Sequence, residues 1–296
     1  MPPSGVSRAN GRILEFAARY PDRLWLLLWV LGMGILLGWD FAFLNAPALH
    51  QLIDALTNSM IAGMMVVIFS LLLGWISGAA LFLAERRGHH ILYYVGSFIV
   101  NLVRSIPQIV GMLAGYVVLT LVIERNAGIN PSTLLFWMSM ITAGVVFYDV
   151  TDLVRSRIVQ FASLDFYPAM LCSGVRESRI INIEILWKNS RAHLLQVMIS
   201  VFGMALFLQC SIDFVLSVGL SAEVSATNFP ITLGSLLATM DSKQDILSIG
   251  TALTAPSYLP YLLTRHLQGV SVAFVITYTL MCVHNVTNGF VRRHRL

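Results

Sequence analysis

The chain has 296 residues, of which 57% are hydrophobic and only 11% are charged, and its mean hydropathy is +0.76. Soluble domains carry about 25% charged residues, so this composition excludes an ordinary soluble protein and predicts a membrane domain. The net charge is +4. In a membrane protein, arginines in cytoplasmic loops account for such a positive charge, so it does not indicate nucleic-acid binding.

Six apolar stretches are long enough to cross a bilayer, which takes about 20 helical residues. Pro107 interrupts the third stretch and predicts a kink or break that separates an inner segment from an outer one. We therefore expect an all-α membrane protein with six transmembrane helices near residues 24–44, 58–84, 91–123, 133–156, 195–220 and 269–291.

The distribution of basic residues predicts the orientation of these spans. With the N-terminus inside, only Arg125, Lys243 and Arg265 of the 19 lysines and arginines lie outside, and Arg104 lies within the third span. The positive-inside rule thus places both termini in the cytoplasm. A signal peptide cut near Ala46 is the rival interpretation of the N-terminus, but the first apolar run is longer than a typical h-region.

This orientation divides the chain into a cytoplasmic N-terminal segment, 1–23, and a transmembrane domain, 24–296. The domain carries a cytoplasmic loop at about 157–192 and an outer loop at about 221–268. Apolar stretches in the outer loop are expected to form short helices against the outer face. No tandem repeat or low-complexity tract is present.

The sequence contains no motif that predicts bond chemistry. Its only lysines, Lys188 and Lys243, do not follow a glycine as a phosphate-binding loop requires, so we do not expect this chain to hydrolyse ATP. His89 and His90 are adjacent and would face different ways on a helix, which disfavours a metal site. We expect no catalytic residue, no bound cofactor and no metal in this chain.

Polar groups inside apolar spans are candidates for function, because charges in hydrocarbon are costly and usually face the interior of the bundle. Asp149 and Asp152 lie near the inner end of the fourth span, and Asp152 is expected to pair locally with Arg155. Gln209 and Asp213 lie four residues apart on one face of the fifth span. Gln209, Asp213 and Asp149 are the candidates for lining a pathway; for Asp213, pairing with another helix or subunit is the alternative.

Two pairs of glycines have the spacing that permits close approach of membrane helices. They are Gly74 with Gly78, and Gly111 with Gly115. Such pairs predict tight helix packing within the bundle, or a subunit interface.

The cytoplasmic loop resembles the coupling segment of ABC-importer permeases, which runs Glu-Ala-Ala, three residues, Gly, nine residues, Ile-x-Leu-Pro. Here Pro168-Ala169-Met170 is followed by Gly174 and then by Glu184-Ile185-Leu186-Trp187. The central alanine, the glycine and the leucine are kept; the glutamate, the second alanine, the isoleucine and the proline are not.

Other segments, in the right order along residues 58–296, are similar to the dipeptide, oligopeptide and nickel permease family. They are RSIPQIVGMLAGYVVL at 104–119, VTDLVRSRIVQFASLDFYPAML at 150–171, ITLGSLLATMDSKQDILSIGTAL at 231–253 and HNVTNGFVRR at 284–293. The Gly-Thr-Asp…Gly-Arg-Asp run that this family usually carries before the second helix is absent.

The resemblance implies a type I ABC-importer permease fold in the bacterial inner membrane, with a peptide or related small solute as substrate. It also implies a second homologous permease subunit, ABC ATPase subunits that bind ATP and Mg, and an extracytoplasmic substrate-binding protein. The motif assigns Ala169, Gly174 and Leu186 to coupling with the ATPase, and we expect Arg176, Glu177 and Arg179 to take part in the same contact.

The loop's own residues fit such coupling. Gly174 permits a sharp turn between two short helices. Arg176, Glu177 and Arg179 would lie at the rim of the contact. An apolar face for a groove on the partner would come from Val175, Ile180, Ile181, Ile183 and Leu186.

Two other classes of membrane protein remain open at this point. A stand-alone secondary transporter would use Asp149, Asp152 or Asp213 as proton or ion sites. A scaffold descended from a permease would hold a complex together without transport. Co-purification of an ATPase distinguishes an importer from both.

Overall fold

The computed structural model describes residues 20–125, 130–219, 229–239, 250–261 and 267–294. Most of the expected N-terminal segment and much of the outer loop lie outside these ranges. Several basic residues used to predict the orientation lie outside them too: Arg8, Arg12, Arg19, Lys243, Arg265 and Arg295.

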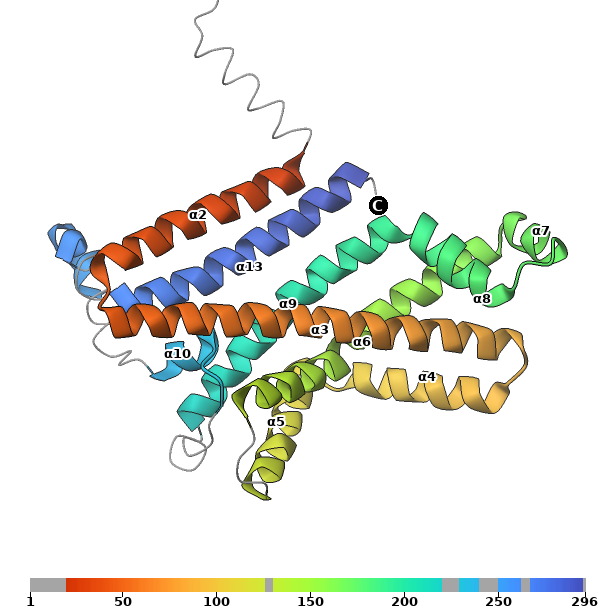
Figure 1. The fold of residues 1–296 in the computed structure, drawn as a ribbon, viewed down its shortest axis with the longest axis horizontal. Helices are drawn as coiled ribbons and strands as arrows, with labels where there is room; N and C mark the ends of the chain where they lie inside the picture. The colour runs from red at the N-terminus through yellow and green to blue at the C-terminus, as the bar shows by residue number, and fades with distance from the viewer. Residues whose placement is uncertain (1–19, 126–129, 220–228, 240–249, 262–266, 295–296) are drawn as a thin grey trace, which may run out of the picture.

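The described residues form helices and no strands (Figure 1). The long helices are α2 (Pro21–Phe43), α3 (Ala46–Arg86), α4 (His90–Ser105), α5 (Gln108–Arg125), α6 (Pro131–Ala162), α9 (Arg191–Gly219) and α13 (Leu267–His294). Among them, five are long and apolar enough to cross a membrane, or six if the bent pair of α4 and α5 counts as one span. This agrees with the predicted multi-span helical protein.

Helix α3 begins at Ala46, twelve residues before the predicted span. Nothing interrupts the helix after Pro47, which occupies its first turn, where a proline is tolerated. Leu52 and Ala55 are completely buried beside α2, α10 (Leu233–Thr239) and α13. The residues between 46 and 57 are therefore part of one 41-residue helix rather than of a loop.

The predicted break at Pro107 is confirmed: α4 and α5 meet at an angle of 99°. Ile106, just before the proline, has an extended backbone (φ −84°, ψ 126°), because the proline ring disfavours a helical conformation in its predecessor. We call this break, residues 104–108, the elbow. In Figure 1, α4 runs back along α3, whereas α5 turns away.

The most extensive helix packing among the described residues is between α3 and α6, and two glycines make it close. A Cβ atom on Gly74 would lie 2.4 Å from Val150 Cβ, and one on Gly78 would lie 2.9 Å from the Thr151 carbonyl oxygen. The Ser77 and Thr151 hydroxyls are hydrogen-bonded at 2.7 Å. Gly74 and Gly78 thus lie at a close helix contact, as their spacing predicted.

The second predicted glycine pair serves the packing of α5 on α6. A Cβ atom on Gly115 would lie 2.3 Å from Ile141, and one on Gly111 would lie 3.3 Å from Val145. Helix α6 is therefore in close contact with α3 and with α5.

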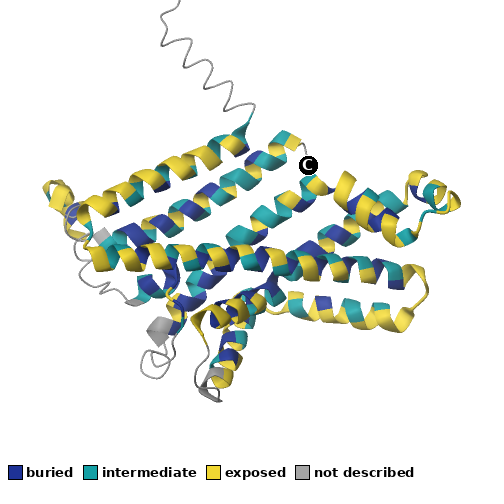
Figure 2. Ribbon diagram, viewed as in Figure 1, coloured by how far each residue is buried: buried dark blue, intermediate teal, exposed yellow. Residues whose placement is uncertain are grey.

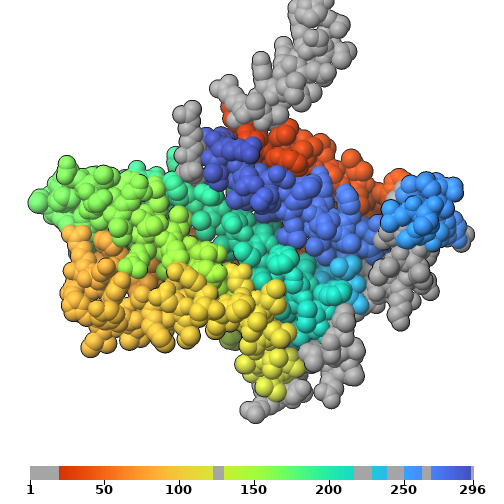
Figure 3. Space-filling model, turned by 180° about the vertical axis from the view of Figure 1, so that it is seen from behind, coloured from red at the N-terminus to blue at the C-terminus, as the bar shows by residue number. Residues whose placement is uncertain are grey.

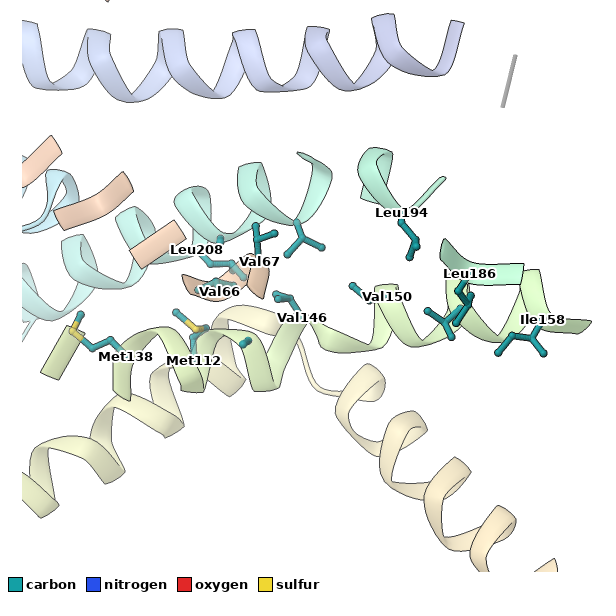
Figure 4. Packing of buried hydrophobic residues seen from close by; sticks show 14 of the residues in the cluster. Val66, Val67, Met112, Met138, Val146, Val150, Ile158, Leu186, Leu194 and Leu208 are labelled. Carbon is teal, nitrogen blue, oxygen red and sulfur yellow. The ribbon is translucent and has the colours of Figure 1, made fainter. Parts of the chain in front are cut away.

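The main core follows α6 along its length. Buried side chains of α3, α5 and α9, among them Val66, Met112 and Leu208, converge on Val146 and Val150 of α6, as the sticks in Figure 4 show. Colouring by burial shows the contrast with α2 and α4, whose surfaces are mostly exposed (Figure 2). Exposed apolar faces on the outer helices of a bundle are expected where lipid replaces water.

Helices α2 and α13 lie side by side as a pair at the edge of the bundle (Figure 1). A polar contact joins them near each end. Arg293 donates to Asp22 at 2.8 Å, and the Ser271 hydroxyl donates to Asp40 at 2.6 Å. Both carboxylates are buried, so these contacts fix the register of the pair.

We expect Gly74→Ala to destabilise the protein by about 1–3 kcal/mol, because the added methyl group overlaps Val150 and forces the two helices apart. Thermal unfolding of the purified chain in a mild detergent measures the effect. Gly144→Ala on α6 is the matched control, since a Cβ atom there meets nothing within 4 Å. Equal melting temperatures for the two variants would contradict the importance of this contact.

Candidate functional site

The predicted coupling loop forms a compact projection between α6 and α9, which we call the coupling segment, residues 163–190. It contains α7 (Phe166–Cys172), α8 (Glu177–Arg179) and the π-helix η1 (Ile180–Asn189). Gly174 has φ +79°, the left-handed conformation in which only glycine is unstrained. The predicted sharp turn between two short helices is therefore present, and it lies at Gly174.

Glu177 joins the coupling segment to the turn between α3 and α4. Its carboxylate lies 3.4 Å from Arg86 Nε and 3.5 Å from Arg87 Nη2, and it accepts a hydrogen bond of 2.8 Å from the Tyr167 hydroxyl. The Arg86 guanidinium also lies 4.5 Å above the Tyr167 ring. Seen from behind, the segment packs directly against the end of α3 (Figure 3). Glu177 is thus a point of attachment between the segment and a long helix.

Burial of the phenol strengthens this attachment. Burial, together with the bond to the negatively charged Glu177, raises the pKa of Tyr167 to about 12, although Arg86 and Arg87 oppose the shift. Tyr167 therefore stays protonated at physiological pH and remains a donor to Glu177.

The prediction that the isoleucines and Leu186 offer an apolar face to a partner is wrong for most of them. Ile180, Ile181 and Leu186 are fully buried in the core formed with α6 and α9. The backbone hydrogen bonds of a π-helix span five residues instead of the four of an α-helix, so side chains that α-helical spacing would turn outward can face inward. Among the predicted set, Ile183 is exposed, and so is its unpredicted neighbour Trp187, at 69%.

A side-chain hydrogen bond fixes η1 to α3: the Trp75 indole donates to Asn182 Oδ1 at 2.8 Å. The buried residues of η1 therefore pack on the bundle and are not open to a partner. Exposed residues of the segment that were predicted to take part in coupling lie on α7, on the following turn and on α8: Ala169, Gly174, Arg176 and Arg179.

A second polar region lies at the elbow. Arg104 donates to Asp152 on α6, and its guanidinium lies 5.7 Å from the centre of the Tyr148 ring. The Gln108 amide donates to the Tyr148 hydroxyl at 2.8 Å. Asp149, half-buried on the same face of α6, is within electrostatic range of both Arg104 and Asp152.

The predicted local pair between Asp152 and Arg155 is wrong. Arg155 donates to Glu85 at 3.0 Å and to the Tyr93 hydroxyl at 2.8 Å, so it reaches α3 and α4. Asp152 pairs across the bundle with Arg104 instead. The bend at the elbow brings Arg104 to α6, and only the tertiary fold determines that approach.

Asp213 belongs to a separate region near the C-terminal end of α9. Its carboxylate accepts a hydrogen bond from Thr232, which also accepts one from the Ser235 backbone N–H at 3.2 Å and so caps α10. Ser59 on α3 accepts from the Leu233 backbone N–H at 3.0 Å. These contacts attach α10 to α3 and α9, in line with pairing of Asp213 to another helix.

Gln209 lies one turn from Asp213 and is 4% exposed. No described residue hydrogen-bonds to its amide oxygen or nitrogen. A buried amide without hydrogen-bond partners lowers the stability of a protein, so packing alone does not explain a glutamine at position 209. The three predicted pathway residues do not lie together. Asp149 lies in the elbow region, whereas Gln209 and Asp213 lie on α9.

The most informative residue that the sequence interpretation passed over is Tyr167, which is 1% exposed and anchors Glu177. Asp40 was also missed, although a carboxylate inside the first apolar run is itself a signal. Within the described ranges, no group of three or more His, Cys, Asp or Glu side chains is arranged to hold a metal ion.

We expect Glu177→Gln to loosen the coupling segment, because the amide cannot neutralise Arg86 and Arg87. Hydrogen exchange in residues 163–179 should become about tenfold faster, the change that corresponds to losing roughly 1.4 kcal/mol of charge-assisted bonding. Glu184→Gln is the control: its partner Lys188 lies on the same helix, and no contact to α3 is lost. Unchanged exchange in Glu177→Gln would show that the attachment is not energetically significant.

Neither a protein-family model nor a curated protein sequence matches this chain. We therefore infer its function from the contacts of the described residues and from the sequence motifs.

Proposed function

We propose that this chain is a permease subunit of an ATP-driven ABC importer in the bacterial inner membrane, with both termini in the cytoplasm. It would form half of a translocation pathway, together with a second homologous permease subunit, for a peptide or a related small solute. ATP and Mg would be bound by separate ATPase subunits, and an extracytoplasmic binding protein would deliver the solute.

The observation that carries this proposal is the way in which the coupling segment is built. One side of the segment is exposed, on α7, on the Gly174 turn and at Ile183 and Trp187 of η1, whereas its buried residues and Glu177 attach it to α3, α6 and α9. A partner that pushes on α7 would therefore move the long helices as rigid bodies. A surface loop without a mechanical role has no need of so many attachments to the bundle.

Bond chemistry is not required of this chain for such a role. Two ion pairs connect α3 with α6 and with the coupling segment. Arg155 of α6 pairs with Glu85 of α3, and Glu177 of the segment pairs with Arg86 of α3. Displacement of the segment would reach α3 and α6 together through these pairs.

A stand-alone secondary transporter is the alternative that the charges at the elbow favour, since ionisable groups in spans often mark ion pathways.

A photo-crosslinking residue at Ala169 tests the proposal in native membranes. We expect it to capture an ATPase subunit with a nucleotide-binding motif, because Ala169 lies on the exposed face of the segment. The same photo-crosslinking residue placed at Phe41 should capture no ATPase subunit. Phe41 is 78% exposed and lies near the C-terminal end of α2. Mild-detergent purification should also recover a second six-helix permease. Recovery of this chain alone by both methods would overturn the importer and favour the secondary transporter.

A second variant tests the lever itself. Gly174→Ala should cost roughly 1–2 kcal/mol in backbone strain and misplace α7, so we expect solute uptake to fall while the complex still assembles. Gly88→Ala is the matched control, since Gly88 also has a positive φ (+73°) and open space around it. Equal uptake by the two variants would show that the Gly174 turn does not transmit the motion.

A further inference from the structure

The elbow combines three features that are individually unfavourable next to lipid. The first is its backbone. Ile106 and Pro107 interrupt the helix directly after Ser105, and all three residues are exposed. Non-helical backbone at membrane depth is tolerated only where protein covers it or where it lines a water-filled cavity.

The elbow lies at such a depth because apolar helix continues on both sides of it. Exposed apolar side chains precede it on α4, among them Phe98 and Leu102, and follow it on α5, among them Val110 and Val117. It also lies about 24 Å along α4 from the turn at His90, given a rise of about 1.5 Å per residue. A lipid-facing surface would carry no polar break at this position.

The second feature is an exposed ion pair. The side chains of Arg104 and Asp152 are 43% and 53% exposed, although they are bonded to each other. Ionised side chains within spans face the bundle interior or water rather than hydrocarbon. The ion pair thus identifies the same surface as the interrupted backbone does.

The third feature is an excess of negative charge. Arg104 balances Asp152, and no hydrogen bond joins Asp149 to a described residue. Asp149 lies three residues before Asp152 on the same face of α6. The Tyr148 ring has the Arg104 guanidinium 5.7 Å from its centre, so it already has a cationic neighbour. A surface with one uncompensated carboxylate favours a positively charged group.

We propose that the elbow lines a water-accessible cavity and contacts a cationic group, such as a primary ammonium, of the solute that passes through. Asp149 accepts the cationic group, Tyr148 lies beside it, and the Arg104–Asp152 pair holds the elbow against α6. This assignment rests on the proposed transport function and adds to it the charge class of the solute.

Cysteine labelling in native membrane vesicles tests the elbow without knowledge of the solute. In a full-length chain with Cys172, Cys210 and Cys282 replaced by serine, Ser105→Cys places one thiol at the break. The probes are two membrane-impermeant methanethiosulfonates, one bearing a trimethylammonium group and one a sulfonate. Their rates are normalised to those with a free thiol in solution, and both are applied from each side of the membrane.

We expect both probes to react, with the cationic one favoured roughly tenfold, because a nearby unpaired carboxylate attracts the trimethylammonium probe and repels the sulfonate. Asp149→Asn should remove most of that preference, and Asp149→Glu should retain it. Ile35→Cys on α2 is the control for a lipid-facing position: it is 73% exposed among apolar residues and should react with neither probe.

Two outcomes would overturn the assignment. Failure of both probes to label Ser105→Cys would show that the elbow is covered and not wet. Labelling without a cationic preference, or with one that Asp149→Asn leaves intact, would show that Asp149 does not set the charge selectivity. The expected labelling pattern combined with no co-purifying ATPase would have a different meaning. The assignment of the elbow would then stand, and only the importer function would be rejected.

Discussion

The close contact of α3 with α6 is the constraint on which the other features of the structure depend. At Gly74 and Gly78 the two helices approach so closely that even a methyl group on either glycine would clash. Van der Waals packing of this kind is a main source of stability where lipid removes the hydrophobic drive for helix association. Because the two helices are held in register, the groups along both of them become fixed relative to each other.

That register places charged groups where they can join separate parts of the chain. Glu85 of α3 meets Arg155 of α6, and one residue further Arg86 meets Glu177 of the coupling segment. These pairs are partly exposed, so each contributes modestly, but together they form a network. The inner ends of α3, α4 and α6 and the coupling segment are therefore connected by side chains as well as by the chain itself.

The same helix α6 carries the polar surface of the elbow one to two turns further into the bundle. Asp149 and Asp152 face Arg104 there, on the side of α6 toward which α4 and α5 bend. Helix α6 is one continuous helix from Pro131 to Ala162, so it connects the elbow with the coupling segment without an intervening loop.

The sequence by itself determined the helical class, the presence of several apolar helices long enough to span a membrane, the break at Pro107, the close packing at the glycine pairs and the turn at Gly174. These features follow from local properties: the apolar run length, the missing N–H of proline, the absent Cβ of glycine and its freedom at positive φ. Each is encoded within a few residues, so no knowledge of distant contacts is needed.

Only the tertiary structure decided which charges pair and which apolar residues are buried. Arg155 lies three residues from Asp152 but bonds to Glu85, because the packing of α3 and α4 on α6 offers a partner that spacing cannot reveal. The inward direction of Ile180, Ile181 and Leu186 depends on the π-helical winding of η1 and on the core that receives it. Long-range pairing and an unusual helix geometry have no local signature, so a single sequence could not predict them.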